Sequence, residues 1–266
     1  MNKTSRLCLV IIFTVVTTVT NEFVYAQSAE NAWTELVGKR FSQHSEFTFV
    51  EHNKTLPNVL LYGDSISIGY SSTVREALLT QANVYRIHLN GGDASSFISK
   101  MTKMHNTMQN PALEDPWLFN WDVIHFNVGL HDLKYLNNKK LDKTHGKQVS
   151  TIKEYKNNLK NIVVYLKKIA PNAKLIFATT TPIPSGEPGR IVGDAAKYNA
   201  AALEVMKDFS EVAINDLYTF TKPNHKAWWQ DTGNVHYNKI GKNAQGTEVA
   251  RNILAQLSTI NYQLKK

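Results

Sequence analysis

The chain has 266 residues, of which 42% are hydrophobic and 20% are charged, and it carries a formal net charge of +8. This much apolar material suffices for a sizeable core, so a wholly disordered chain is excluded. The single cysteine excludes an intramolecular disulfide and a cysteine-based zinc cluster. A mean hydropathy of −0.31 argues against a polytopic membrane protein.

The N-terminus, 1–26, is typical of a secretory signal peptide. Lys3 and Arg6 precede an apolar run, 7–19, which is shorter than the roughly 20 residues that cross a bilayer. Residues 24–26 then supply small or tolerated side chains at the −3 and −1 positions of a cleavage site. We therefore expect a secreted or periplasmic protein that does not insert stably in a membrane. The alternative is an uncleaved membrane anchor.

The excess of basic residues is dispersed along the chain. Lysine pairs such as 139–140 and 167–168 lie far apart and do not alternate with aromatic residues. This distribution argues against nucleic-acid binding. A solvated basic surface is the simplest explanation, and on an exported protein it would meet anionic surfaces and polysaccharides.

Residues 57–266 alternate short apolar runs with segments of helical periodicity, whereas 27–56 is polar and is predicted to be an N-terminal arm. The predicted strands are 59–62, 83–89, 122–128, 173–180 and 212–215, and the predicted helices are 74–79, 95–108, 159–169, 194–208 and one near the C-terminus. A polar insertion occupies 134–150. Strands that alternate with helices imply a parallel sheet covered on both faces. The sequence therefore predicts one α/β domain, a three-layer α/β/α sandwich.

Ligands of such sheets bind outside the carboxyl ends of the strands, so the residues that follow each strand are candidates for a site. The first strand is followed by Gly63-Asp64-Ser65. A strand that turns sharply into a helix would present Ser65 at the helix N-terminus, where backbone N–H groups favour negative charge. Ser65 is thus a candidate nucleophile if a base lies beside it. Taken alone, the tripeptide is more typical of a helix cap than of a catalytic serine.

Three further segments at this predicted edge carry candidates. Gly92 permits close approach of a backbone N–H to a ligand, although ordinary turn chemistry also explains it. His131 follows the third strand and could donate to an oxyanion, unless its segment only caps a helix at Asp132. His236 stands in a polar loop before the last helix, and an imidazole there is suited to act as a general base.

Together, these segments resemble the SGNH/GDSL hydrolases over residues 57–250. Residues 63–65 match the first conserved block with its serine, and Gly92 stands at the glycine of the second. The resemblance implies a flavodoxin-like fold, with Ser65 as nucleophile and His236 as base. It also implies an oxyanion hole formed by the N–H groups of Ser65 and Gly92 and by His131.

The chain departs from the family pattern at two positions. His131 stands where the family usually has asparagine, although a neutral imidazole can also donate one N–H. Gly233 stands three residues before His236, where an aspartate is expected to orient the imidazole. Asp231 lies five residues before the histidine and Asn234 two. We expect Asp231 to orient His236 and complete the catalytic set; the alternative is a backbone carbonyl in a Ser–His dyad.

The resemblance implies ester hydrolysis through an acyl-enzyme, and no motif requires a metal or nucleotide cofactor. Three aromatic residues near the histidine, Trp228, Trp229 and Tyr237, could bind a sugar ring or merely pack. The expected substrate is a small-molecule or polysaccharide ester, with O-acetylated carbohydrate preferred. The alternatives are a lysophospholipase or short-chain lipid esterase, an acetyl transferase that uses the same serine, and a non-catalytic glycan-binding relative.

Overall fold

The structure, a computed structural model, describes residues 26–260 and has a five-stranded parallel sheet at its centre. The strand order is β2-β1-β3-β7-β8, which is the order of flavodoxin-like folds. The strands are β1 (Asn58–Tyr62), β2 (Asn83–Arg86), β3 (Val123–Asn127), β7 (Lys174–Ala178) and β8 (Ala213–Asn215). The predicted signal peptide lies, except for residue 26, outside the described residues.

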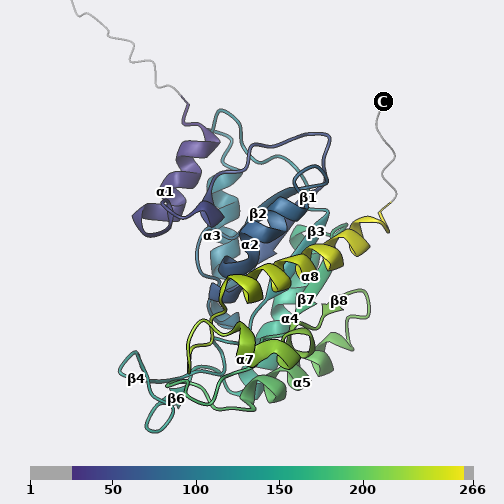
Figure 1. Cartoon of the computed structure of the whole chain (residues 1–266). Helices are drawn as coiled ribbons and strands as arrows, with labels where there is room; N and C mark the ends of the chain where they lie inside the picture. Colours follow the sequence, from purple (N-terminus) through teal and green to yellow (C-terminus); the bar gives the residue numbers. More distant parts are fainter. Residues whose placement is uncertain (1–25, 261–266) are drawn as a thin grey trace, which may run out of the picture.

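Helices cover both faces of this sheet, which confirms the predicted three-layer fold (Figure 1). One face carries α2 (Ser65–Ala77) and α8 (Lys239–Leu257), and the other carries α3 (Phe97–Met108), α4 (Ile152–Ile169) and α5 (Asp194–Met206). Short helices α6 (Leu217–Thr221) and α7 (His225–Trp228) precede α8, and 3-10 turns lie at Ser45–Phe47, Ala94–Ser96 and Lys222–Asn224.

Burial on both faces explains why β1 and β7 are mostly apolar runs rather than alternating ones. All five residues of β1 and of β3 are buried, and Leu60 pairs with Ile124 between them. The amphipathic helix α4 buries the side chains of Leu159, Ile162 and Val163 against the same core. Full burial of such side chains contributes about 1.5–3 kcal/mol each relative to exposure. The sheet is therefore a firm support for the loops at its carboxyl edge.

The polar insertion forms a small antiparallel sheet of order β5-β4-β6 that the sequence analysis did not predict. Its strands are β4 (Tyr135–Asn137), β5 (Lys140–Leu141) and β6 (Lys147–Gln148). Asn138 and Lys139 both have positive φ, as the tight hairpin between β4 and β5 requires. Tyr135 N–H donates to the carbonyl of Gly189 at 2.7 Å, so the small sheet is anchored beside the strand ends.

The N-terminal arm contains a helix, α1 (Ala29–Phe41), which packs against α3. Trp33 is buried, and its Nε1–H donates to the carbonyl of Phe47 at 2.6 Å. Figure 1 shows α1 on one side of the N-terminus of α2 and the small sheet on the other. No helix among residues 26–260 combines the length and apolarity needed to span a membrane.

Candidate active site

Ser65 is the first residue of α2, directly after the turn that leaves β1. Asp64 caps the helix, since its Oδ1 accepts from the N–H of Ile66 at 2.9 Å. A side chain at Gly63 would place its Cβ 2.7 Å from Ser67, so this turn requires glycine. Both interpretations of the tripeptide therefore hold: Asp64 is the cap, and Ser65 presents its hydroxyl at the helix N-terminus, where its own N–H has no intrahelical acceptor.

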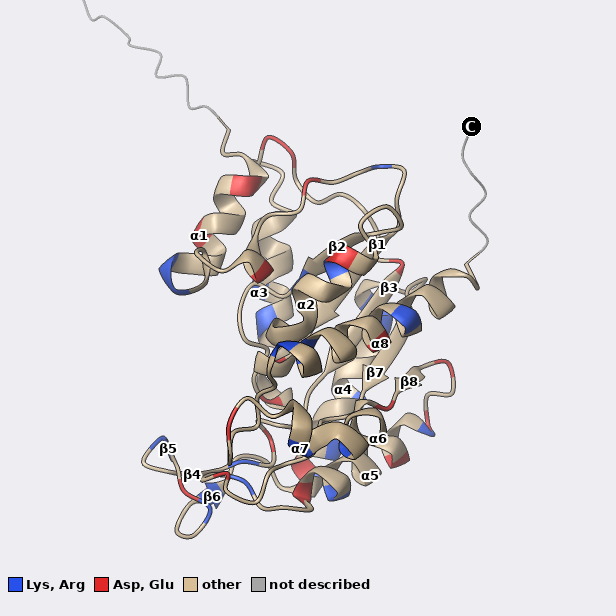
Figure 2. Ribbon diagram, viewed as in Figure 1, with Lys and Arg blue, Asp and Glu red and all other residues tan. Residues whose placement is uncertain are grey.

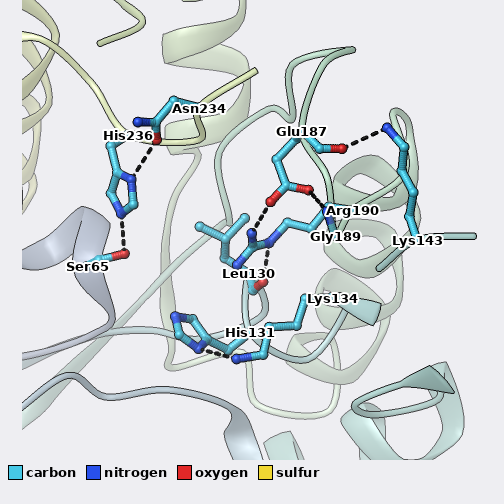
Figure 3. A network of polar contacts seen from close by, with 10 residues as sticks. All are labelled: Ser65, Leu130, His131, Lys134, Lys143, Glu187, Gly189, Arg190, Asn234 and His236. Carbon is cyan, nitrogen blue, oxygen red and sulfur yellow. Dashed lines mark hydrogen bonds and ion pairs between the residues drawn. The ribbon is translucent and has the colours of Figure 1, made fainter. Parts of the chain in front are cut away.

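His236 lies 171 positions after Ser65 in the sequence but beside it in the structure. Its Nε2 lies 2.9 Å from the Ser65 Oγ (Figure 3). The loop that carries His236 is closed by an isolated bridge between Trp229 and Tyr237, and it leads into α8, which is capped by Asn238. The histidine is thus held beside the serine by the start of a long helix.

Asn234, rather than Asp231, binds the second nitrogen of the imidazole. The Oδ1 of Asn234 lies 2.7 Å from His236 Nδ1 and 3.0 Å from the backbone N–H of the same residue. Because a backbone N–H can only donate, the atom it meets must be the amide oxygen, and the ring must then donate from Nδ1. The Nε2 lone pair is left to accept the Ser65 hydroxyl proton, as a general base must.

The expectation that Asp231 orients His236 is therefore wrong. Asp231 lines the same cavity, but within the described residues its carboxylate makes no hydrogen bond or ion pair with the imidazole. The reason lies in Gly233, whose φ of +76° turns the loop sharply against Gly186. This turn directs the next side chain, that of Asn234, onto the ring.

The surroundings of His236 keep its imidazole neutral. Burial lowers its pKa below the usual 6.5, and the positive charges of Arg190 and Lys242 lower it further, while Glu187 opposes them. A neutral imidazole at neutral pH is the form that can accept a proton from Ser65. The electrostatics therefore suit the role of base.

His131 lies in the same cavity and is held in one tautomer. Its Nδ1 lies 3.0 Å from the Nζ of Lys134, an ammonium group that can only donate. Burial and then the charge of Lys134 lower the pKa of His131 to about 3, so the ring is neutral. The proton must therefore sit on Nε2, which lies on the side of the ring nearer Ser65 (Figure 3). The ring can donate there, as the predicted oxyanion role requires.

Gly92 does not offer a free N–H, contrary to the role that the resemblance implies. With a φ of +68°, its N–H donates to the Oδ1 of Asn90 at 2.9 Å. Asn90, which the sequence analysis missed, lines the cavity beside Ser65, and its Nδ2 has no partner among residues 26–260. The side-chain amide therefore stands between the glycine and the cavity.

A buried ion pair that the sequence analysis also missed braces the cavity. Arg190 Nη1 lies 2.6 Å from Glu187 Oε1, and its Nε–H donates to the carbonyl of Leu130 at 2.8 Å. Glu187 Oε2 accepts the N–H of Gly189 (Figure 3). This pair connects the loop after β3, which carries His131, to the loop that faces His236. No spacing pattern in the sequence marks it.

The three aromatic residues proposed for substrate binding do not line this cavity. Tyr237 is 2% exposed, Trp228 packs on Phe220 with 5.8 Å between ring centroids, and Trp229 packs on His225 at 4.4 Å. The bridge between Trp229 and Tyr237 folds their segment back on itself. These contacts support the packing interpretation, and sugar binding by these residues stays a prediction.

The cavity beside Ser65 has a volume of about 680 Å³ and contains both histidines. Its lining residues come from α1, the strand-end loops, the small sheet and the loop before α8: Arg40, Ser65, Asn90, His131, Lys134, Leu136, Lys139, Leu141, Glu187, Pro188, Arg190 and 231–236. Across residues 26–260, no group of three or more His, Cys, Asp or Glu side chains is placed to hold a metal ion.

Residues 61–244 match the model of the GDSL-like lipase/acylhydrolase family. The chain belongs to this family. No curated protein matched the sequence. Together with its esterase neighbours, membership in the GDSL-like family supports an ester-acting hydrolase and confirms the resemblance drawn from the sequence.

Solved structures share the fold of this GDSL-like protein at low sequence identity. An acetyl xylan esterase is 19% identical with a TM-score of 0.55, covering 74% of this chain and 99% of its own. A lipase/acylhydrolase from Enterococcus faecalis is 18% identical with a TM-score of 0.58, covering 76% and 97%. The catalytic domain of a peptidoglycan O-acetyltransferase from Streptococcus pneumoniae is 16% identical with a TM-score of 0.50, covering 77% and 96%.

Proposed function

We propose that this chain is an exported serine esterase that removes acetyl groups from O-acetylated carbohydrate through an acyl-enzyme. The observation that carries the proposal is the 2.9 Å contact between His236 Nε2 and Ser65 Oγ in an open cavity. A hydroxyl hydrogen-bonded to an oriented neutral imidazole is the arrangement that activates serine as a nucleophile.

In the first step, His236 Nε2 accepts the hydroxyl proton while Ser65 Oγ bonds to the acyl carbon of the ester. The imidazolium that forms keeps its Nδ1–H on Asn234. The tetrahedral intermediate then expels the alcohol oxygen, which takes the proton from Nε2. The acyl group stays on Ser65.

The negative charge that develops on the oxygen of the tetrahedral intermediate must be stabilised by hydrogen-bond donors. The Ser65 N–H, at the start of α2, and the Nε2–H of His131 are suited to this role. The Nδ2 of Asn90 is a third donor at the same cavity wall. Removal of one such donor typically raises the barrier by about 2.7–4 kcal/mol.

In the second step, a water molecule gives one proton to His236 and attacks the acyl carbon. The bond from the acyl carbon to Ser65 Oγ breaks, the serine regains its proton, and a carboxylic acid leaves. The cavity is open enough to admit water after the alcohol departs, which favours hydrolysis.

The acetyl preference is supported by two neighbours whose names concern acetyl esters of carbohydrate polymers.

The signal-peptide pattern of residues 1–26 supports export, because polysaccharides of this kind lie outside the cytoplasm. A leaderless variant expressed beside the full chain would test this: we expect only the full chain, shortened at residue 26, outside the cytoplasm.

A fluorophosphonate probe tests the nucleophile. We expect it to label the wild type and not Ser65→Ala, which should also lose at least about 10³-fold in kcat on p-nitrophenyl acetate. Ser72→Ala is the matched control, since Ser72 is an exposed serine of the same helix. A folded wild type that resists labelling would instead support a glycan-binding protein without catalysis.

Substrate class is tested by acetate release from acetylated xylan, beside p-nitrophenyl esters from acetate to palmitate. We expect rates to fall with acyl length. A maximum at long chains would favour the lipid esterase alternative. Transfer of acetyl to an added acceptor sugar, in place of free acetate, would favour the transferase.

A further inference from the structure

The cavity beside Ser65 has an excess of positive charge on its walls. Four cationic side chains line it, against two carboxylates. Glu187 is neutralised by Arg190 at 2.6 Å, in a pair that is almost fully buried. This leaves Arg40, Lys134 and Lys139 facing the single carboxylate of Asp231.

Two of these cations, Arg40 and Lys139, form no ion pair with any residue in 26–260. Lys134 positions His131, but Lys139 is exposed and makes no hydrogen bond or ion pair with any residue in 26–260. Arg40 is also exposed, and its guanidinium only rests 5.2 Å from the ring of Phe41. Exposed cations that line a cavity and pair with no acid are available to an anionic ligand.

The two free cations reach the cavity from opposite sides. Arg40 belongs to the last turn of α1, and Lys139 to the turn between β4 and β5. Figure 2 shows basic residues at the end of α1 and on the small sheet, with the start of α2 between these two elements. A ligand that met both cations would therefore lie across Ser65 and extend beyond it on each side.

We propose that the ester accepted at this site belongs to an anionic carbohydrate polymer, whose charged groups flank the acetylated sugar and pair with Arg40 and Lys139. This inference rests on the proposed esterase function and specifies its substrate. Carboxylate, sulfate and phosphate groups share the chemistry that such cations recognise. A neutral polymer such as xylan would leave both cations unused.

The test compares kcat/KM for acetate release from an O-acetylated polyuronate, an O-acetylated sulfated polysaccharide and acetylated xylan. We expect at least one anionic polymer to exceed xylan about tenfold at low salt. In the Arg40→Gln, Lys139→Gln double variant this preference should fall about threefold to tenfold, mainly through KM. Raising NaCl from 0.05 to 0.5 M should reduce the preference of the wild type in the same way, because salt screens exposed charges.

The chain offers a matched control for this charge change. Lys39 and Lys140 are the sequence neighbours of the two cations, are exposed, and do not line the cavity. Their double exchange to glutamine removes the same net charge and should leave the preference unchanged. If both double variants lower it equally, the effect comes from overall charge and the inference is wrong. Equal kcat/KM on anionic and neutral polymers also overturns it.

Failure of the esterase proposal can be distinguished by a binding measurement. Affinity electrophoresis of Ser65→Ala in gels that contain the unacetylated polyuronate or sulfated polymer requires no catalysis. We expect retardation that depends on Arg40 and Lys139 and not on the control pair. Retardation without any acetate release by the wild type would overturn the esterase and retain the anionic site; release without a charge preference would do the reverse.

Discussion

The Oδ1 of Asn234 lies 2.7 Å from the Nδ1 of His236, in place of the carboxylate that the family resemblance led us to expect. The amide oxygen fixes the tautomer and the orientation of the ring. It carries no net charge, however, so it gives less stabilisation to the imidazolium that forms when Ser65 loses its proton. The site therefore combines a well-placed base with a weak electrostatic partner.

Replacement of Asn234 by aspartate should strengthen the base. His236 acts in its neutral form, so kcat/KM should fall as pH decreases through its pKa, which burial and nearby cations hold below 6.5. A carboxylate at Nδ1 favours the protonated ring, so in Asn234→Asp this acidic limb should move to higher pH. The same charge should raise kcat on the alkaline plateau, by up to about tenfold for roughly 1.4 kcal/mol of stabilisation. Profiles with p-nitrophenyl acetate from pH 4.5 to 9 measure both effects.

Asp231→Asn is the control for this experiment, because Asp231 lines the cavity without a hydrogen bond or ion pair to the imidazole. Its acidic limb should stay within about 0.3 pH units of the wild type. A limb that moved down in Asp231→Asn as far as it moved up in Asn234→Asp would restore Asp231 as the orienting group.

The contact between Lys134 and His131 leads to a prediction about the oxyanion donor. His131→Ala should lower kcat on p-nitrophenyl acetate by about 10²-fold with little change in KM, since a donor that acts in the transition state is lost. Lys134→Met should lower kcat less, because the ring survives but its tautomer is no longer fixed. These effects should appear in kcat while the thermal midpoint changes little.

A double-mutant cycle separates positioning from bulk charge. In His131→Asn the amide donates its N–H without help from Lys134. Addition of Lys134→Met to that variant should therefore cost much less than addition to the wild type. Equal costs in both backgrounds would mean that Lys134 acts only through its charge.

The sheet was predictable from local sequence patterns, and the serine–histidine pair was predictable from the topology of that sheet. The run that forms β1 is short, apolar and followed by Gly63, which together are typical of a strand buried on both faces. Once the strands were placed, the rule for carboxyl edges indicated where Ser65, His131 and His236 would gather. Their convergence follows from topology rather than from any one motif.

The features that could not be predicted from the sequence depend on how the loops close. Whether Asp231 or Asn234 meets the imidazole is decided by the positive φ of Gly233 and its contact with Gly186, which spacing alone does not reveal. The small sheet was not predicted because its strands have two or three residues, too few to show an alternation with a period of two. The packing of Trp229 beside Tyr237 depends on the isolated antiparallel bridge between them, which the sequence spacing does not reveal.

Asp132 provides a prediction about stability, because it connects two of the loops that form the site. Its buried carboxylate accepts the N–H of Ala94 at 3.0 Å and the hydroxyl of Ser150 at 2.8 Å. Asp132→Ala leaves both donors without their partner, and we expect the free energy of unfolding to fall by about 2–4 kcal/mol. Urea titration with the far-UV circular dichroism signal measures this loss.

The contribution of Asp132 to stability should depend on pH with a definite sign. Burial raises the pKa of Asp132 to about 7, above the usual 3.8, and the hydrogen bonds from Ser150 and Ala94 only partly oppose this rise. The folded state therefore binds a proton more readily than the unfolded state, so the wild type should gain stability relative to Asp132→Asn as pH falls from about 8 to 5. Asparagine does not titrate, and other groups contribute equally to both proteins. A stability difference that shrank on acidification would show that Asp132 is ionised more readily in the fold than in the unfolded chain.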